Sequence, residues 1–257
     1  MSEPRNYTIA AVDRALCVLE DLAGQPRQGV TDIASRLGFT KTIVFRLLST
    51  LEARGFVVRE GDKAIYSLGY RMGVLGDQAG LQNTLLAAAR PVMERLRDDT
   101  TETINLILRE DRRSLVLASL EGHHAMRIYA KAGRYGPLHA GGGSMLLLAN
   151  APKDIRESVL AEPLEPFTAA TVIDPDDLRV HLDMIRADGF HIAINDLDEG
   201  AFSIAAPIWG ASHQVIASVS VAGAMVRYDE VRRRRYLELV GEAAAEISGK
   251  LGLSASA

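Results

Sequence analysis

The alternation of apolar and polar positions predicts three helices and a β-hairpin within the first 70 residues. Apolar side chains recur at helical spacing over residues 8–23, 31–37 and 41–53, and Thr40 is a suitable N-cap for the third segment. Two β-rich runs, FVVRE and KAIYSL, then flank a Gly-Asp turn. The predicted inward-facing positions are Ile9, Val12, Leu16 and Leu19, then Ile33, Ala34 and Leu37, then Val44, Leu47, Leu48 and Leu51.

This order of elements is the plan of a winged helix-turn-helix. The connection between the second and third helices is short and contains Gly38, as a helix-turn-helix requires. Three helices alone are weak evidence for this fold, but a hairpin placed directly after them makes the pattern more specific.

The remaining chain mixes strands and helices in both orders, which predicts an α+β domain with one sheet flanked by helices. Residues 70–98 are predicted to be mostly helical, beginning as a linker helix and continuing into this second domain. β-like runs occupy 103–108, 114–120, 126–130, 202–208 and 214–221, and helical patterns occupy 144–150, 152–160, 175–188 and 228–251.

Composition agrees with two folded domains of modest size. The 257 residues are 47% hydrophobic and 24% charged, near the average of globular proteins. A single cysteine, Cys17, forms no internal disulfide and favours a cytoplasmic location. No apolar run approaches the roughly 20 residues that span a bilayer, so no membrane partner is expected.

The net charge of −4 argues at first sight against nucleic acid, but its distribution changes that view. Residues 1–80 carry ten Lys/Arg and nine Asp/Glu (net +1), whereas residues 81–257 carry nineteen and twenty-four (net −5). No acidic residue lies between Asp32 and Glu52. Because charge is screened within about 8–10 Å, a local basic face suffices to meet DNA phosphates. On charge alone, a solvated helix face with chance clustering is the better explanation of this window.

Stretches along nearly the whole chain resemble the IclR family of bacterial transcriptional regulators, in the family's order and spacing. They are TDIASRLGFTKTIVFRLLSTLEARGFVVRE, YSLGYRMGVLG, GPLHAGGGSMLLLA, IRADGF, SIAAPIW and VIASVSVAG. The resemblance implies a winged helix-turn-helix DNA-binding domain over 1–70, a linker helix over 71–84 and a GAF-like effector-binding domain over 85–257. It also implies dimers or dimers of dimers.

In a helix-turn-helix, the N-terminal part of the second motif helix enters the major groove. The outward residues expected to meet bases or phosphates there are Thr40, Lys41, Thr42, Phe45 and Arg46. Candidates for backbone contacts are Arg36, Arg59 and Lys63, the last at the tip of the wing. The alternative for Arg46 is an ion pair within the domain. For Arg36, Arg59 and Lys63 the alternative is a solvated charge that contacts no DNA.

The stretch His139–Ser144 precedes an apolar helix, and its three successive glycines suggest an anion site at a helix N-terminus. A tight turn that needs positive φ explains the glycines as well. The family resemblance implies an effector pocket lined by Ile128, Gly142, Gly143, Ala193, Ala201, Ser203, Ser220 and Ala222.

The chain departs from the family pattern at three places in this pocket. Ala193 replaces a frequent acidic residue, Ala222 replaces a serine, and Ser144-Met145 replaces the usual Gly-Lys pair. A pocket with fewer polar groups favours a bulkier, more apolar organic acid, and we expect an aromatic one.

Other chemical signals are weak. His123-His124 lacks partners at metal-ligand spacing, and no G-x-S-x-G surrounds Ser144. Arg232–Arg235 fits a solvated helix face, with a subunit or DNA contact as the minority interpretation. We therefore expect no catalytic residue, metal or cofactor, and predict a ligand-responsive repressor or activator that binds double-stranded operator DNA, for example at a catabolic operon. The alternative is an enzyme or small-molecule carrier whose N-terminal helices only dimerise.

Overall fold

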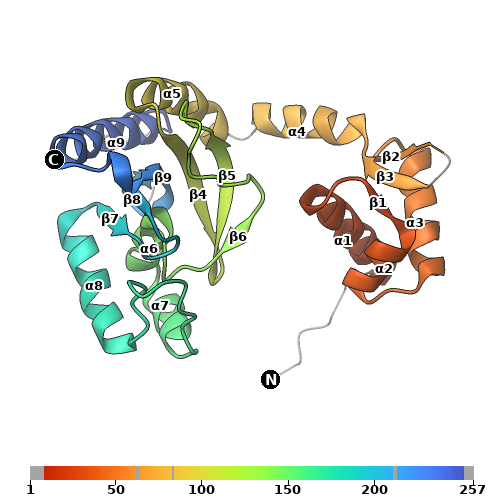
Figure 1. Cartoon of the computed structure of the whole chain (residues 1–257), viewed down its shortest axis with the longest axis horizontal. Coiled ribbons are helices and arrows are strands. Elements are labelled where there is room, and N and C mark those ends of the chain that lie inside the picture. Colours follow the sequence, from red (N-terminus) through yellow and green to blue (C-terminus); the bar gives the residue numbers. More distant parts are fainter. Residues whose placement is uncertain (1–8, 62–63, 83, 211–212, 252–257) are drawn as a thin grey trace. The chain divides into compact units, whose positions relative to one another are not determined.

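The chain folds into two compact units in a computed structural model that describes residues 9–61, 64–82, 84–210 and 213–251 (Figure 1). The first unit ends at Gln82 and the second comprises the rest of the chain. No helix among the described residues is long and apolar enough to cross a membrane.

The first unit is a winged helix-turn-helix, as the sequence predicts. Its elements are α1 (Ala10–Gly24), β1 (Gln28–Gly29), α2 (Val30–Leu37), α3 (Lys41–Ala53), β2 (Val57–Glu60), β3 (Ile65–Leu68) and α4 (Tyr70–Gln82). β3 lies between β1 and β2 in an antiparallel sheet that forms the wing. Gly38, at φ 68°, ends α2 in the left-handed conformation that glycine adopts at least cost.

The core of this unit corrects the sequence prediction for α1. Val18 and Leu22 point into the core, whereas Val12 and Leu16 are each 54% exposed. The predicted stripe was therefore wrong at Ile9, Val12 and Leu16 but right at Leu19, which packs against the core, because α1 carries apolar residues on two faces. For α2 and α3 the prediction is closer, since Ile33, Ala34, Val44 and Leu48 are buried and Leu37, Leu47 and Leu51 pack around them.

The second unit is an α+β domain built on a six-stranded antiparallel sheet in the order β6-β5-β4-β9-β8-β7. Its strands are β4 (Thr103–Glu110), β5 (Arg113–Leu120), β6 (Tyr135–Gly136), β7 (His191–Ile194), β8 (Ala201–Trp209) and β9 (Val215–Ala224). Its helices are α5 (Thr84–Thr100), α6 (Gly142–Ala149), α7 (Lys153–Leu160), α8 (Pro175–Asp188) and α9 (Glu230–Lys250), with the short 3₁₀ helix η1 (Met225–Arg227).

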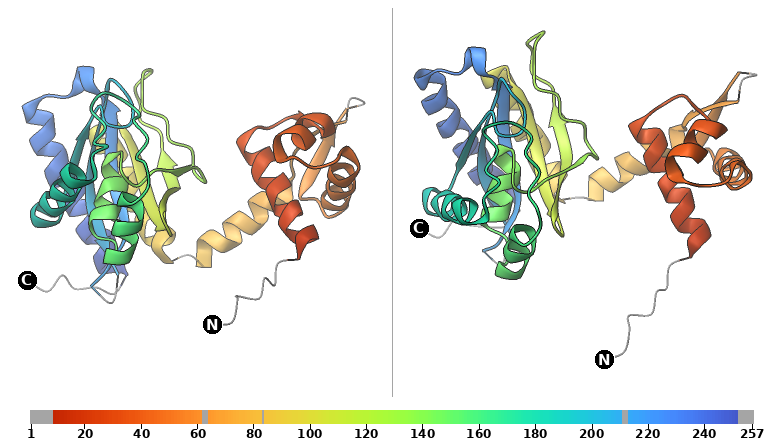
Figure 2. Two further views of the ribbon diagram at one scale, coloured as in Figure 1. Left: turned by 90° about the horizontal axis from the view of Figure 1, so that it is seen from below. Right: turned by 60° about the horizontal axis from the view of Figure 1, so that its bottom comes forward.

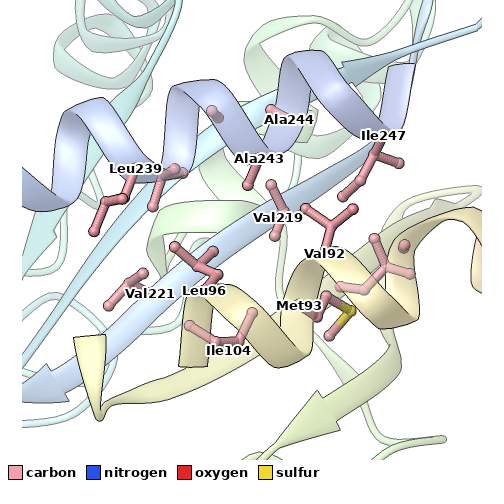
Figure 3. Packing of buried hydrophobic residues seen from close by; sticks show 14 of the residues in the cluster. Val92, Met93, Leu96, Ile104, Val219, Val221, Leu239, Ala243, Ala244 and Ile247 are labelled. Carbon is pink, nitrogen blue, oxygen red and sulfur yellow. The ribbon is translucent and has the colours of Figure 1, made fainter. Parts of the chain in front are cut away.

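Helices cover both faces of this sheet (Figure 2). α5 and α9 pack on one face and on each other, while α6 packs on the other face with α7 and α8 outside it. Because successive side chains of a strand point to opposite faces of the sheet, alternate residues face either α5 and α9 or α6. Ile104, Val219 and Val221 point to α5 and α9 and form the main core with Leu96 and Ile247 (Figure 3).

The intervening strand positions face α6 and carry smaller or polar side chains. Asn105 on β4, Ser203 on β8 and Ser220 on β9 belong to this set. The face toward α5 and α9 therefore builds the main core, whereas the face toward α6 combines a second core around α6 and α8 with room for a pocket.

Three further sequence predictions, across both units, can be compared with the structure. Residues 126–130 form no strand. Their carbonyl groups accept hydrogen bonds from side chains rather than from a neighbouring strand: Thr103 donates to the Ile128 carbonyl and Arg227 donates to the Met126 carbonyl. The prediction that 70–98 is mostly helical is confirmed, with the run divided into α4 and α5, and Asn83 between them lies outside the described residues. The short strands β1, β6 and β7 were missed because two to four residues carry too little periodicity.

His191 on β7 makes the stability of this unit sensitive to acid. The residue is 4% exposed, its Nε2 has no hydrogen-bond partner in the described part of the chain, and its ring meets that of His181 edge-on with 5.2 Å between the ring centroids. Burial, with a smaller contribution from the charge of His181, lowers the pKa of His191 from 6.5 to about 3. As pH falls below 6.5, the unfolded chain binds the proton and the folded chain does not.

We therefore expect His191 to remove about 2 kcal/mol from the free energy of unfolding between about pH 7.5 and about pH 5. Urea titrations at both pH values would show a smaller loss for His191→Leu than for the unmodified chain. The exposed His213 provides the control, since His213→Leu should retain the full loss. An equal pH dependence for all three proteins would contradict the assignment.

Candidate functional site

α3 presents an acid-free outward surface at its N-terminal end. Thr40 caps the helix, its Oγ1 accepting a hydrogen bond from the Ile43 N–H at 3.3 Å. Lys41, Thr42, Phe45 and Arg46 are all exposed. The side chain of Phe45 is 52% exposed, so it lies outside the core of this unit. The five residues predicted to read DNA thus lie on one solvent-facing segment.

The predicted backbone-contact residues lie in different settings. The Arg36 guanidinium bonds both carboxylate oxygens of Asp21 at 2.8 and 2.7 Å and reaches Gln28 at 3.1 Å. Arg36 therefore links α2 to α1 through this ion pair, a role that the sequence did not reveal. Its contact with DNA stays a prediction. Arg59 is exposed on β2. Lys63 lies outside the described residues.

The second unit contains a pocket of about 530 Å³ between the α6 side of the sheet and the loops around it. This volume is typical of sites for small organic ligands. All eight residues predicted for the effector pocket line it: Ile128, Gly142, Gly143, Ala193, Ala201, Ser203, Ser220 and Ala222. The structure therefore brings them together, although they come from five separate segments of the chain.

The glycines before α6 have a packing role that the sequence did not distinguish. A Cβ on Gly142 would lie 2.6 Å from Ser203 Oγ, and one on Gly143 would lie 2.8 Å from both Ile107 Cδ1 and Ser218 Oγ. These glycines let the N-terminus of α6 rest directly on the sheet, and Gly141 supplies the positive φ of 85° at the entry to the helix.

The expected anion site at this helix start already holds a carboxylate of the chain. Asp196 Oδ2 accepts a hydrogen bond from the Gly141 N–H at 2.7 Å, and Asp196 also lines the pocket. Burial raises the pKa of Asp196, while its bonds to the N–H groups of Gly141, Asp196 and Leu197 act in the opposite direction. The prediction that the glycine loop alone forms an anion site is therefore corrected: the loop and Asp196 form one unit.

The pocket floor is also more polar than the sequence suggested. Asn105, Ser220 and Ser119 lie side by side on β4, β9 and β5 in the register of the sheet. Ser119 Oγ donates to Asn105 Oδ1 at 2.8 Å. Ser220 is 1% exposed and its Oγ has no hydrogen-bond partner among the described residues. Asn105 and Asp196 were not predicted from the sequence, and with them the pocket is not short of polar groups.

Arginines border the pocket on the side of β5 and β6. Arg112, Arg113 and Arg134 line it there. Arg112 pairs with Glu162, and Arg113 lies over the ring of Tyr135 at 4.7 Å. Among the described residues, Arg113 and Arg134 have no carboxylate partner. This side of the pocket therefore favours a negatively charged group.

The remaining chemical candidates have structural explanations. His123 contacts Asp98 at 3.2 Å and His124 contacts Thr101 at 2.9 Å, and no group of described side chains could hold a metal ion. Arg232, Arg233 and Arg235 pair with acidic neighbours on the exposed side of α9 or at its N-cap. Cys17 is half-buried in α1.

A winged helix-turn-helix joined to a sheet domain with a ligand-sized pocket defines the class of ligand-responsive transcriptional regulators. Residues 11–61 match the IclR helix-turn-helix domain, and residues 79–249 match the C-terminal domain of bacterial transcriptional regulators of the IclR type. The chain belongs to the IclR family of transcriptional regulators, whose members bind DNA and effectors.

Individual relatives agree over nearly the full length. The HTH-type transcriptional regulator KipR of Bacillus subtilis is 30% identical over 96% of this chain and 98% of its own. A solved IclR-type regulator from Alicyclobacillus acidocaldarius superposes with a TM-score of 0.89 at 26% identity, over 96% of this chain and 100% of that one. An IclR homologue from Microbacterium hydrocarbonoxydans, solved with 4-hydroxybenzoate, gives 0.84 at 28% identity over 95% and 100%.

Proposed function

We propose that this protein binds a two-fold symmetric operator as a dimer and changes its operator affinity when a small aromatic organic acid enters the pocket, for example to control a catabolic operon. Thr40, Lys41, Thr42, Phe45 and Arg46 contact bases and neighbouring phosphates, and Arg36, Arg59 and Lys63 contact the backbone. No metal or organic cofactor takes part. The observation that carries this proposal is one pocket whose arginine-bordered side and apolar walls suit such an acid.

Several features support an aromatic acid as the effector. Ile107, Val116, Phe167 and Leu197 add apolar walls to the pocket, and its volume accommodates a substituted ring. Arg113 and Arg134 supply positive charge. The Microbacterium hydrocarbonoxydans relative was solved in complex with an aromatic acid, 4-hydroxybenzoate.

The exposed apolar side chains of the first unit support the dimer. Val12 and Leu16 of α1 line a groove with Ile43 and Leu47 of α3, and Tyr70 and Val74 of α4 are 71% and 46% exposed. Exposed apolar patches commonly mark protein interfaces. A second copy of the chain would cover them and set two recognition helices about 34 Å apart on a palindromic site.

A charge placed in this groove should therefore disrupt the dimer. We expect Leu16→Glu to shift sedimentation equilibrium toward the monomer and to weaken operator binding with it. Val180→Glu on α8, where the native side chain is 62% exposed, is the matched control and should leave both unchanged. A Leu16→Glu protein that remains as associated as the unmodified chain would place the interface elsewhere.

The proposal as a whole is tested by selecting genomic DNA fragments that bind the purified protein and footprinting the protected sequence. We expect a palindromic site, bound with an affinity that falls steeply with salt because Lys and Arg displace counterions from phosphates. An enzyme or carrier whose N-terminal helices only dimerise would select no sequence, and that result would refute the proposal.

A further inference from the structure

The two sides of the effector pocket carry opposite hydrogen-bonding character, which constrains the ligand beyond its being an acid. Donors gather toward β4 and β5, and a fixed acceptor lies beyond β7. In the order of the strands, β4 and β7 are separated by β9 and β8. Three strand spacings put about 14 Å between the backbones of β4 and β7.

On the donor side, the amide of Asn105 is held in one orientation. Asn105 is 5% exposed and lines the pocket. Because Ser119 Oγ–H occupies the Asn105 carbonyl oxygen at 2.8 Å, the amide turns its Nδ2 group away from Ser119. Nδ2 makes no hydrogen bond to the described residues, and the neighbouring buried Ser220 hydroxyl has no partner among them either. The Ser220 hydroxyl thus lacks the partner that buried polar groups require, and the Asn105 amide beside it lines the same pocket.

On the acceptor side, the Asp196 carboxylate is held by the backbone. Gly141 N–H donates to Oδ2 at 2.7 Å, which leaves further lone pairs on a group that lines the pocket. The loop carrying Asp196 is itself fixed, since Thr171 Oγ1 donates to the Asp196 carbonyl at 2.6 Å and Thr168 Oγ1 donates to the Asn195 carbonyl. A second carboxylate would be repelled here, whereas a hydroxyl would gain a charge-assisted hydrogen bond.

We propose that Asn105 and Asp196 determine the specificity of this pocket: Asn105, with Ser220, binds the carboxylate of the effector, and Asp196 accepts a hydrogen bond from a hydroxyl at its far end. This inference rests on the proposed function and names the effector class as an aromatic hydroxy acid. Arg113 and Arg134 lie on the Asn105 side and add attraction for the carboxylate. Short oxo-acids fail to join the two sides, since about three strand spacings separate the backbones of β4 and β7.

Calorimetric titration of the full-length protein with 4-hydroxybenzoate, benzoate, phenol and pyruvate tests the inference. We expect 4-hydroxybenzoate to bind about tenfold or more tightly than benzoate, since losing a hydrogen bond to a charged group costs at least that much. Phenol lacks the carboxylate and pyruvate lacks the ring and hydroxyl, so both should bind more weakly still.

Two variants separate the two ends of the ligand. Asp196→Asn should reduce the preference for 4-hydroxybenzoate over benzoate to within about threefold, because a neutral amide accepts more weakly than a carboxylate. Asn105→Leu should weaken both acids by a similar factor and leave their ratio unchanged. Asp183→Asn on the exposed side of α8 and Asn150→Ala at the end of α6 are the matched controls. Thermal unfolding of each variant shows whether it is folded.

The outcomes distinguish this inference from the proposed function. Equal binding of benzoate and 4-hydroxybenzoate, or tighter binding of pyruvate, would overturn the hydroxy-acid assignment. So would an undiminished preference in a folded Asp196→Asn protein. If no acid binds at millimolar concentration while palindromic DNA is still bound, the hydroxy-acid inference fails and operator recognition stands. Loss of sequence-specific DNA binding would instead refute the proposed function itself.

Discussion

Replacing Glu102 with alanine is expected to lower the free energy of unfolding of the second unit by about 3–5 kcal/mol. Glu102 follows α5, is 1% exposed, and receives two hydrogen bonds of 2.6 Å from Arg227. Removing the carboxylate leaves the partly buried Arg227 guanidinium without its counter-charge. The same guanidinium also holds the carbonyl of Met126 at 3.1 Å, so the loop beside the pocket should loosen as well.

Denaturant titration followed by the fluorescence of Trp209, the single tryptophan of the chain, measures this loss in the second unit. The exposed pair of Arg235 and Glu238, 3.7 Å apart, supplies the control. Glu238→Ala should cost no more than about 1 kcal/mol, because solvent screens that pair. A Glu102→Ala protein as stable as the Glu238→Ala protein would show that the buried pair contributes no more than a surface one.

Replacing Arg46 with alanine should weaken specific operator binding by about tenfold or more. A guanidinium that forks onto a base edge contributes about 1–3 kcal/mol of discrimination, and Arg46 is exposed on the outward surface of α3. Fluorescence anisotropy with the selected operator and with a scrambled duplex measures the loss. The specific complex should weaken far more than the non-specific one.

Arg54 is the matched control, since it lies at the other end of α3, where the helix has left the expected path of the groove. Arg54→Ala should preserve the preference for the operator over the scrambled duplex. Circular dichroism should show both variants folded. Unchanged operator affinity in Arg46→Ala would remove this residue from the interface and favour a role beside the α1 groove, which Arg46 also borders.

Local signals in the sequence were sufficient for much of the fold. α8 begins and ends where predicted because Asp174 caps it with two hydrogen bonds and Gly189 ends it at φ 74°. The recognition helix α3 was found in the same way, from the Thr40 cap. In contrast, 126–130 has strand-like composition but bonds to distant side chains, which no local pattern encodes.

The pocket residues likewise fall into those that could be predicted from the sequence and those that could not. The eight residues implied by the family resemblance do line one cavity, yet their contact with an effector remains a prediction. Asp196 was missed because its partner Gly141 lies 55 positions away in the chain. Asn105 was missed because its significance depends on strand register, which places it between Ser119 and Ser220. The positions of Asp196 and Asn105 in the pocket thus depend on contacts between distant segments, which composition and spacing do not predict.

The most direct test of a ligand-responsive regulator is operator affinity measured with the pocket empty and with it saturated by 4-hydroxybenzoate. We expect the acid to change the dissociation constant of the operator complex by about 5- to 150-fold, and the operator to change the affinity for the acid by the same factor. Asn105→Leu should keep the operator affinity of the ligand-free protein and lose the response. An operator affinity that is identical with the pocket empty and full would contradict the account.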